Sequence, residues 1–475
     1  MRSSGRALQW LAVWIVLGVL LALGFVGAVF LRPAMVALGA ETTGAPTTVP
    51  PTLFEPPPVE QVEPPIGTGL VGPAAVAEPG TEPSRDVLEA RLAALDTTAL
   101  AAGAEEGLLL GLEVLDVETG EVLAARNADQ PLIPASNTKL LTVAAVINAF
   151  EDEDTFATTV VQPEPGRIVL VGGGDPLLTS VPAEPGTYPR PASLEELAAA
   201  AAEALSAAGQ SSVAVGYDAS LFEEEWNRTW PGNYADQVTR ITALWADEGR
   251  QANRVRSNTP AALAAQTFAA QLTAEGITVT GAPVAALAEG EEIARVESLP
   301  VHVLAEQAML RSNNSFTEVL GMQLALRTGH PATFAGAVAA IEEELAGLGL
   351  WDDAAVIHDA SGLSRSNAVP AAMLAATMRH VATEPRLTVV LDGLPVAGVT
   401  GTLSGRFNDP VSSPARGVAR AKTGSLTRVA TLAGTTVTAD GRVVAYAFMT
   451  NGSADGWAAR IWTDRSVGTL TGCGC

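Results

Sequence analysis

The sequence predicts an α+β domain, in which helices cover an antiparallel sheet, with an inserted α/β module. Three observations predict it. Strand-like segments lie near both ends of the folded region, within residues 108–125 and 417–450. Helices fill the middle, and over residues 151–298 the pattern changes to short strands alternating with Ala-rich helices. Strands from both ends that meet in one sheet, with helices on its faces, form a layered domain.

The first element is an apolar segment at residues 8–31, which contains no charged side chain. A helix of this length measures about 36 Å, enough to span a bilayer. Arg2 and Arg6 precede it, so the positive-inside rule places residues 1–7 in the cytoplasm and the rest of the chain outside. The alternative is a cleaved signal peptide, whose apolar region is usually shorter. We therefore expect a single-pass protein of the cell membrane whose folded domain is extracytoplasmic.

Residues 32–85 follow as a Pro-rich segment that cannot build a core. Eleven prolines fall between Pro46 and Pro83. Such a composition predicts an extended stalk with polyproline II character. The main folded domain then comprises residues 86–150 and 299–475, and residues 151–298 form the inserted domain.

Within the folded region, the polarity pattern and the turn residues predict the elements in order. The expected helices span residues 86–100, 134–150, 194–208, 260–275, 301–310, 316–326 and 456–466. The expected strands span residues 108–117, 121–125, 158–161, 168–171, 213–215, 417–423, 428–438 and 442–450. Asp440 and Gly441 form a hairpin turn between the last two strands.

The charged residues exclude some partners and single out two side chains. A net charge of −24 repels a phosphate backbone, so we expect no nucleic acid partner. Only two of the 28 basic residues are lysines, Lys139 and Lys422. Lysine shifts its pKa readily when it is desolvated, whereas arginine stays protonated. Both lysines are therefore candidate catalytic residues.

The first motif is Ser136-Asn137-Thr138-Lys139, at the start of the apolar helix. A serine and a lysine three positions apart share one helix face. A serine hydroxyl needs a base to become a nucleophile, and a desolvated lysine amine can be that base. The helix N-terminus adds a positive dipole close to the reacting oxygen.

The second motif is Ser312-Asn313-Asn314, between two predicted helices. On such a loop, the hydroxyl of Ser312 can relay a proton beside the lysine. The side chain of Asn314 can bind a substrate amide and hold Lys139. The triplet alone is equally typical of a helix N-cap.

The third motif is Lys422-Thr423-Gly424, followed by Ser425, at the end of a predicted strand. The ammonium of Lys422 and the hydroxyls of Thr423 and Ser425 suit a carboxylate. Gly424 is expected to let substrate approach the backbone closely. The backbone N–H groups of Ser136 and Ser425 are candidates for an oxyanion hole.

These three motifs, in this order, match the set of the penicillin-binding proteins and serine β-lactamases. The sequence resembles the D-alanyl-D-alanine carboxypeptidase/endopeptidase family, the class C low-molecular-mass penicillin-binding proteins, from about residue 108 to residue 452. Four further stretches carry the resemblance. They lie at residues 172–177, 358–365, 394–403 and 420–426.

The resemblance implies a penicillin-binding fold and a role for each motif residue. Ser136 is the expected acylated nucleophile and Lys139 the general base. Ser312, Asn314 and Lys422 complete the catalytic set, and Thr423, Gly424 and Ser425 form the substrate-binding set, with the two hydroxyls on the terminal carboxylate. The expected reaction is cleavage of D-Ala–D-Ala bonds of peptidoglycan stem peptides, and of cross-links, without a cofactor or metal. β-Lactam antibiotics are expected to acylate the enzyme.

The chain also departs from the family pattern. The interval between Ser136 and Ser312 is short for the family, and Asp-Ala-Ser-Gly at residues 359–362 replaces the usual Asp-Gly-Ser-Gly. Two other functions stay open at this point, a serine β-lactamase and a non-catalytic cell-wall-binding protein. Cys473 and Cys475 are expected to be an exposed pair of tail thiols, because a disulfide across Cys-Gly-Cys closes a small strained ring.

Overall fold

The computed structural model describes residue 80, residues 83–104 and residues 107–475. The predicted membrane anchor at residues 8–31, and nearly all of the predicted stalk at residues 32–85, lie outside the described residues. Within the described part of the chain, no helix is both long enough and apolar enough to cross a bilayer. The membrane anchor therefore stays a prediction.

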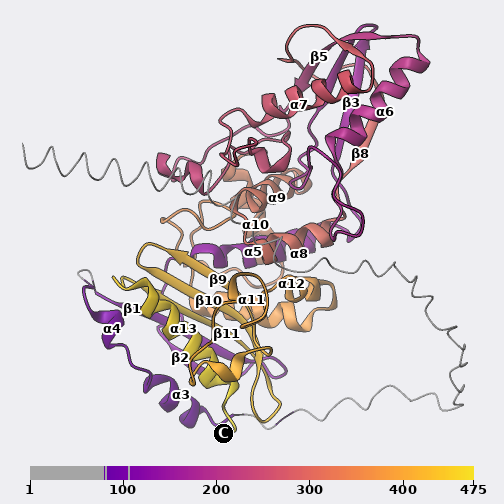
Figure 1. Cartoon of the computed structure of the whole chain (residues 1–475). Coiled ribbons are helices and arrows are strands. Elements are labelled where there is room, and N and C mark those ends of the chain that lie inside the picture. The colour runs from indigo at the N-terminus through magenta and orange to yellow at the C-terminus, as the bar shows by residue number, and fades with distance from the viewer. Residues whose placement is uncertain (1–79, 81–82, 105–106) are drawn as a thin grey trace, which may run out of the picture. The chain divides into compact units, whose positions relative to one another are not determined.

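The predicted antiparallel sheet is present, and it joins the two ends of the folded chain (Figure 1). Its strand order is β2-β1-β11-β10-β9. The strands are β1 (Leu109–Asp116), β2 (Val122–Arg126), β9 (Arg420–Leu426), β10 (Val429–Val437) and β11 (Val443–Asn451). Strand β1 pairs with β11 in a register that places Leu109 opposite Asn451 and Asp116 opposite Val444. The sheet thus depends on segments more than 300 residues apart.

Both faces of this sheet are covered, which is why its central strands are almost continuously apolar. Along β11, Val444, Tyr446 and Phe448 pack into one core and Ala445, Ala447 and Met449 into the other. The first face carries α3 (Arg85–Ala93), α4 (Thr98–Ala101) and α13 (Gly456–Thr471). The second face carries the helical layer.

The helical layer holds the two motif helices. It consists of α5 (Thr138–Ala149), α8 (Val301–Arg311), α9 (Asn314–Arg327), α10 (Phe334–Gly347), α11 (Ala371–Thr383) and α12 (Thr388–Asp392). Helices α10, α11 and α12 were not among the predicted elements. The helix predicted at residues 134–150 begins later than expected, because a 3-10 turn over Ala135–Asn137 precedes α5 and carries Ser136.

Residues 157–297 form a second sheet, with strand order β6-β5-β4-β3-β8 and β7 paired to β5. Its strands are β3 (Ala157–Glu164), β4 (Arg167–Val171), β5 (Ser212–Asp218), β6 (Thr278–Val279), β7 (Val284–Ala285) and β8 (Glu291–Glu297), packed with α6 (Leu194–Ala207) and α7 (Pro260–Ala274). Strands β4 and β5 are parallel and α6 connects them, which gives this region α/β character. The domain boundaries at residues 151 and 298 remain predictions.

Two local predictions were wrong. The single helix predicted at residues 86–100 is two helices, α3 and α4. The side chain of Asp96 accepts a hydrogen bond from the backbone N–H of Thr98 at 2.8 Å, a local bond that favours a turn over a continuous helix.

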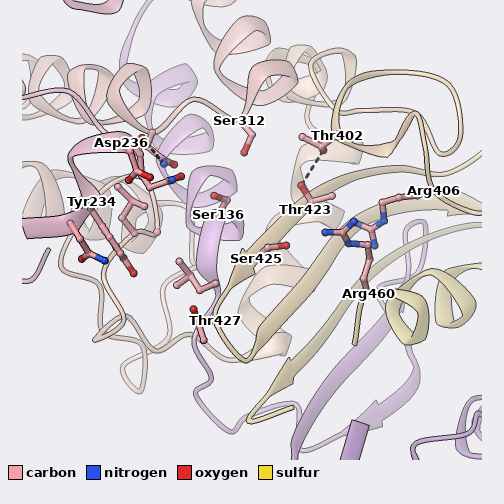
Figure 2. Close-up of a pocket in the computed structure, with 16 residues that line it drawn as sticks. Ser136, Tyr234, Asp236, Ser312, Thr402, Arg406, Thr423, Ser425, Thr427 and Arg460 are labelled. Atoms are coloured by element: carbon pink, nitrogen blue, oxygen red, sulfur yellow. Dashed lines mark hydrogen bonds between the residues drawn. The ribbon is translucent and has the colours of Figure 1, made fainter. Parts of the chain in front are cut away.

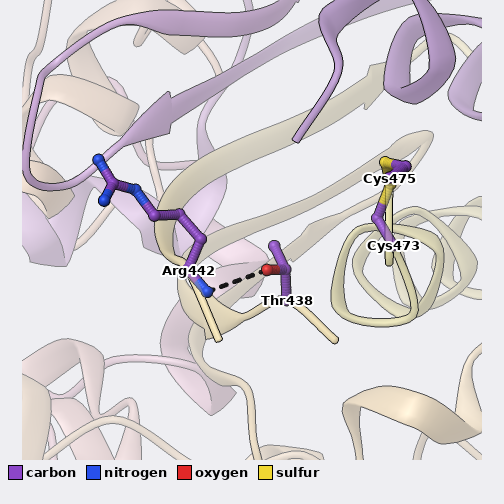
Figure 3. Close-up of a disulfide and its surroundings, with 4 residues drawn as sticks. All are labelled: Thr438, Arg442, Cys473 and Cys475. Carbon is purple, nitrogen blue, oxygen red and sulfur yellow. Dashed lines mark hydrogen bonds between the residues drawn. A yellow bond between two sulfur atoms is a disulfide. The ribbon is translucent and has the colours of Figure 1, made fainter. Parts of the chain in front are cut away.

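The two cysteines are not an exposed pair of thiols. Cys473 and Cys475 form a disulfide, and Cys473 is buried in the core beneath α13 (Figure 3). The two Cα atoms are 5.2 Å apart, within the range that a disulfide bridges. The backbone fixes this tail as well, because the carbonyl of Cys475 accepts from Ser84 N and that of Cys473 accepts from Ala439 N.

One buried ion pair ties the two ends of the sheet together. Arg442, at the turn before β11, donates to both carboxylate oxygens of Asp116 at the end of β1, and also to Glu118. The side chain of Asp116 is fully buried. Burial raises the pKa of Asp116, but the hydrogen bonds from Arg442 and Thr119 outweigh burial and hold that pKa below its ordinary value.

We predict that Arg442→Gln lowers the free energy of unfolding by about 3 kcal/mol, because it leaves a buried carboxylate without its partner. Arg295→Gln is the control, since Arg295 forms exposed ion pairs with Glu292 and Glu297 and should lose less than about 1 kcal/mol. A carboxyl group with a lowered pKa stabilises at neutral pH, and this contribution is lost as the pH falls through its folded-state pKa. Denaturant unfolding should therefore show that the difference in unfolding free energy between wild type and Arg442→Gln becomes smaller below about pH 4. A deficit independent of pH would contradict this account.

Candidate active site

The three motifs converge on one pocket of about 520 Å³ (Figure 2). Each motif contributes to its lining: Ser136 from the first, Ser312 and Asn314 from the second, Thr423 and Ser425 from the third. The two lysines do not line it, because both lie fully buried behind its surface. The sequence therefore predicted correctly which segments meet.

Lys139 has three hydrogen-bond partners from three parts of the chain. Its Nζ lies 3.0 Å from Ser136 Oγ, 2.8 Å from Asn314 Oδ1 and 2.6 Å from the carbonyl oxygen of Ser361. The last two are carbonyl oxygens, which can only accept hydrogen bonds. A neutral amine has two hydrogens for these two oxygens. Its lone pair is then directed at the hydroxyl of Ser136.

The surroundings of Lys139 make this neutral form accessible near neutral pH. Burial lowers the pKa of Lys139 to about 8, although the nearby carboxyl groups of Asp359 and Glu318 act in the opposite direction. Roughly a tenth of the side chains are then free amines at pH 7, a far larger fraction than an exposed lysine provides. The geometry and the lowered pKa together give Ser136 an adjacent base.

Two buried carboxyl groups position the loop that carries Ser361. Glu318 lies one turn after Asn314 on α9 and accepts the backbone N–H groups of Ala360 and Ser361. Asp359 accepts from Gly362 N and Ser364 N, and also from the Asn367 side chain and Trp230 Nε1. Burial, and then the charge of Asp359, raise the pKa of Glu318 to about 8. Neither residue touches the pocket, but both fix an acceptor of Lys139.

The alanine in the Asp-Ala-Ser-Gly segment has a specific place in this packing. Ala360 is fully buried against α9. A Cβ at Gly321 of that helix would lie only 2.8 Å from the Cβ of Ala360. The glycine on α9 therefore leaves room for the extra methyl group.

The turn that carries Ser136 is itself tightly constrained. Ala135 has a φ of 48°, a left-handed conformation that costs energy for a residue with a side chain. A Cβ at Gly362 would lie 1.9 Å from the carbonyl oxygen of Ala135, and one at Gly424 would lie 2.6 Å from that of Pro134. Glycine at both positions lets β9 and the Ser361 loop close on this turn.

This packing corrects the role expected for Gly424. The glycine does not line the pocket, and the space where its side chain would lie is occupied by Thr431 and Pro134. Gly424 thus allows β9 to approach the turn of Ser136 rather than allowing substrate to approach β9.

Lys422 connects the second and third motifs. Its Nζ donates to Ser312 Oγ at 2.6 Å and to the carbonyl oxygen of Thr423 at 2.8 Å. Burial, with a smaller effect from the charge of Lys139, holds the pKa of Lys422 well below its ordinary value. Ser312 ends α8 in a left-handed conformation (φ 51°), which directs it away from the helix and toward the pocket.

Other pocket residues carry no motif that the sequence could have revealed. Asn233, Tyr234, Asp236 and Gln237 come from a loop between β5 and α7, and the carbonyl oxygen of Gln237 accepts from Asn314 Nδ2 at 3.1 Å. On the opposite side, Thr402 Oγ1 lies 3.0 Å from Thr423 Oγ1, and Arg406 and Arg460 complete the wall. None of the four histidines lines the pocket. Within the described residues, no cluster of three His, Cys, Asp or Glu side chains is placed to hold a metal ion.

The sequence matches the D-Ala-D-Ala carboxypeptidase 3 (S13) family over residues 92–258 and 243–471. The chain belongs to this family. Carboxypeptidase Rv3627c of Mycobacterium tuberculosis is 34% identical over 434 residues, which cover 86% of this chain and 88% of that protein. Carboxypeptidase DacB of Mycolicibacterium smegmatis is 33% identical over 419 residues, 85% and 89% of the two chains.

A solved structure supports the predicted fold. The crystal structure of penicillin binding protein 4 (dacB) from Haemophilus influenzae matches 78% of this chain and 98% of its own, with a TM-score of 0.65 at 21% sequence identity. The predicted family, the α+β penicillin-binding fold and the activity of a serine D-Ala-D-Ala carboxypeptidase are confirmed.

We predict that acylation of this S13 peptidase depends on pH through Lys139. Lysine is a base only when neutral, so the second-order acylation rate should rise about tenfold per pH unit and level off above pH about 8. Lys139→Arg keeps the charge but cannot give up its proton, and should lower acylation by about 10²–10⁴-fold at every pH. Stopped-flow acylation by a fluorescent penicillin, with a melting curve of each variant as the control for folding, tests both statements. Rapid acylation of Lys139→Arg would exclude Lys139 as the base.

Proposed function

We propose that Ser136 is the nucleophile that cleaves the bond between the two terminal D-alanines of a peptidoglycan stem peptide. The observation that carries this assignment is the 3.0 Å separation of Ser136 Oγ from the buried amine of Lys139. Family membership supports the reaction, and the geometry supports the residue that performs it.

In the acylation step, the neutral amine of Lys139 takes the proton of Ser136 as Oγ attacks the carbonyl carbon of the penultimate D-alanine. The carbonyl π electrons move to oxygen, and the N–H groups of Ser136 and Ser425 are the proposed donors to this oxyanion. Asn314 holds Lys139 and has an amide side chain on the pocket, where it can bind the amide of the substrate.

Collapse of this intermediate breaks the C–N bond. The departing amine needs a proton, and Ser312 is the proposed donor, because its hydroxyl lies on the pocket and accepts a hydrogen bond from Nζ of Lys422. The proton that Lys139 took from Ser136 replaces the one that Ser312 gives up, so the amine of Lys139 is neutral again. A water molecule then attacks the acyl-enzyme, and Lys139 takes the proton of this water. The proton taken by Lys139 returns to Ser136 as the acid product leaves.

Thr423 and Ser425 are the proposed partners of the terminal carboxylate. Both are on the pocket wall at the end of β9, and their hydroxyl groups can donate to an anion. A peptide bound by this carboxylate has its last peptide bond near Ser136. Cross-links that end in a D-amino acid with a free carboxylate satisfy the same requirement, so we propose endopeptidase activity on them as well.

Ser136→Ala is the test of this assignment. We expect wild-type protein to be labelled by a fluorescent penicillin and to release D-alanine from a D-Ala–D-Ala pentapeptide, and the variant to do neither, because no acyl-enzyme can form. Gel fluorescence and mass spectrometry measure the two products. A wild-type protein that is not labelled would favour a non-catalytic cell-wall-binding protein. Rapid steady-state hydrolysis of the penicillin, without peptide cleavage, would favour the β-lactamase alternative.

We also propose that residues 8–31 anchor the protein in the cell membrane with residues 1–7 inside and the catalytic domain outside. The uncharged segment and the arginines before it support this topology. The full chain should sediment with membranes and resist extraction by high salt, whereas a chain that begins at residue 32, exported by an unrelated signal peptide, should be soluble. Recovery of the full chain in the soluble fraction, shortened by cleavage near residue 39, would favour the signal peptide instead.

A further inference from the structure

The pocket carries charges of opposite sign on opposite walls. Three of its 16 lining residues are charged: Asp236, Arg406 and Arg460. Asp236 lies on the wall formed by the loop between β5 and α7, and the arginines lie beyond Ser136, on the wall that carries Thr423 and Ser425 (Figure 2). The arginines are therefore on the side proposed for the leaving group.

The charge of Arg406 is largely compensated. Its Nη2 lies 2.6 Å from Asp464 Oδ1, and its Nε donates to both oxygens of that carboxylate. Both side chains are almost fully buried. Such a bidentate pair has a fixed geometry and leaves little of either charge for a ligand.

Arg460 differs from Arg406 in this respect. It lies on α13, is exposed, and makes no ion pair or side-chain hydrogen bond with the described residues. Its guanidinium group lies 5.6 Å from the ring centroid of Trp457, one turn earlier on the helix, and this contact limits where the side chain points. Burial has the largest effect on the carboxyl group of Asp464 and raises its pKa, whereas the charges of both arginines act on this group and lower its pKa. One carboxylate between two guanidinium groups leaves this wall with a net positive charge.

Arg460 thus places a cation without an ion pair in a cleft of a chain whose net charge is −24. An acidic protein repels anions, and a local positive charge in a cleft counteracts that repulsion and concentrates an anionic group at that point. The C-terminal carboxylate of the substrate is such a group, and an internal peptide bond is not.

We propose that Arg460 is a specificity-determining residue that binds the carboxylate of the leaving D-amino acid, beside the hydroxyls of Thr423 and Ser425. This proposal rests on the proposed function, because it takes the orientation of the substrate from those hydroxyls. Arg460 thereby selects peptides whose last residue has a free carboxylate, whether that residue is a terminal D-alanine or the acceptor residue of a cross-link.

The test compares an N-acyl D-Ala–D-Ala peptide with the same peptide as its C-terminal carboxamide, and mass spectrometry measures D-alanine or D-alaninamide release. Arg460→Gln should lower kcat/KM for the free acid by about tenfold, mainly through KM, as for the loss of one charge-assisted hydrogen bond. It should change kcat/KM for the carboxamide less than about twofold. Arg460→Lys, which keeps the charge, should retain most of the preference for the acid.

Arg91→Gln is the matched control, because Arg91 is an exposed arginine on α3 outside the pocket and its loss changes the net charge equally. A similar loss in Arg91→Gln and Arg460→Gln would overturn the proposal, since it would show an effect of net charge alone. An equal loss of Arg460→Gln on the acid and the carboxamide would also overturn it. A wild-type protein that cleaves neither peptide contradicts the proposed function itself, and one that cleaves both equally well contradicts only the role of Arg460.

Discussion

The active site depends on the buried amine of Lys139, because three segments that are remote in the sequence meet at that one nitrogen. The turn of Ser136, the start of α9 and the Ser361 loop each supply one hydrogen-bond partner. A cation in this position costs several kcal/mol of desolvation, and the helical core around α5 provides that apolar surrounding. The same burial that makes Lys139 expensive to charge makes it a base, so the packing of the fold and the chemistry of the site have one cause.

The parts of the site that could be predicted from the sequence are those whose residue types are rare or tied to each other by spacing. Lys139 and Lys422 stand out because the chain uses arginine everywhere else, and each has a hydroxyl residue at a fixed interval. Strands β1 and β11 were predictable because both faces of the sheet are buried there, which makes these two strands largely apolar, and clear turns bound them.

The parts that could not be predicted act through contacts that no local pattern encodes. Glu318 is one acidic residue among many, and its role follows only from the two backbone N–H groups that α9 brings it to. The loop with Gln237 has no motif, yet it supports Asn314 from the second sheet. Gly424 was expected to serve the substrate, whereas the structure shows that it serves the packing of the nucleophile's turn.

The pairing of β1 with β11 has a consequence for the order in which the protein folds. Strand β11 is synthesised last and lies at the centre of the sheet, between β1 and β10. Each of these two neighbours therefore has one unpaired edge until β11 has been made. During synthesis the chain therefore carries an unpaired β1 edge while more than 300 further residues emerge. Contacts of such large sequence separation form slowly. The sheet that carries Thr423 and Ser425 is consequently complete only when its last strand, β11, has been synthesised.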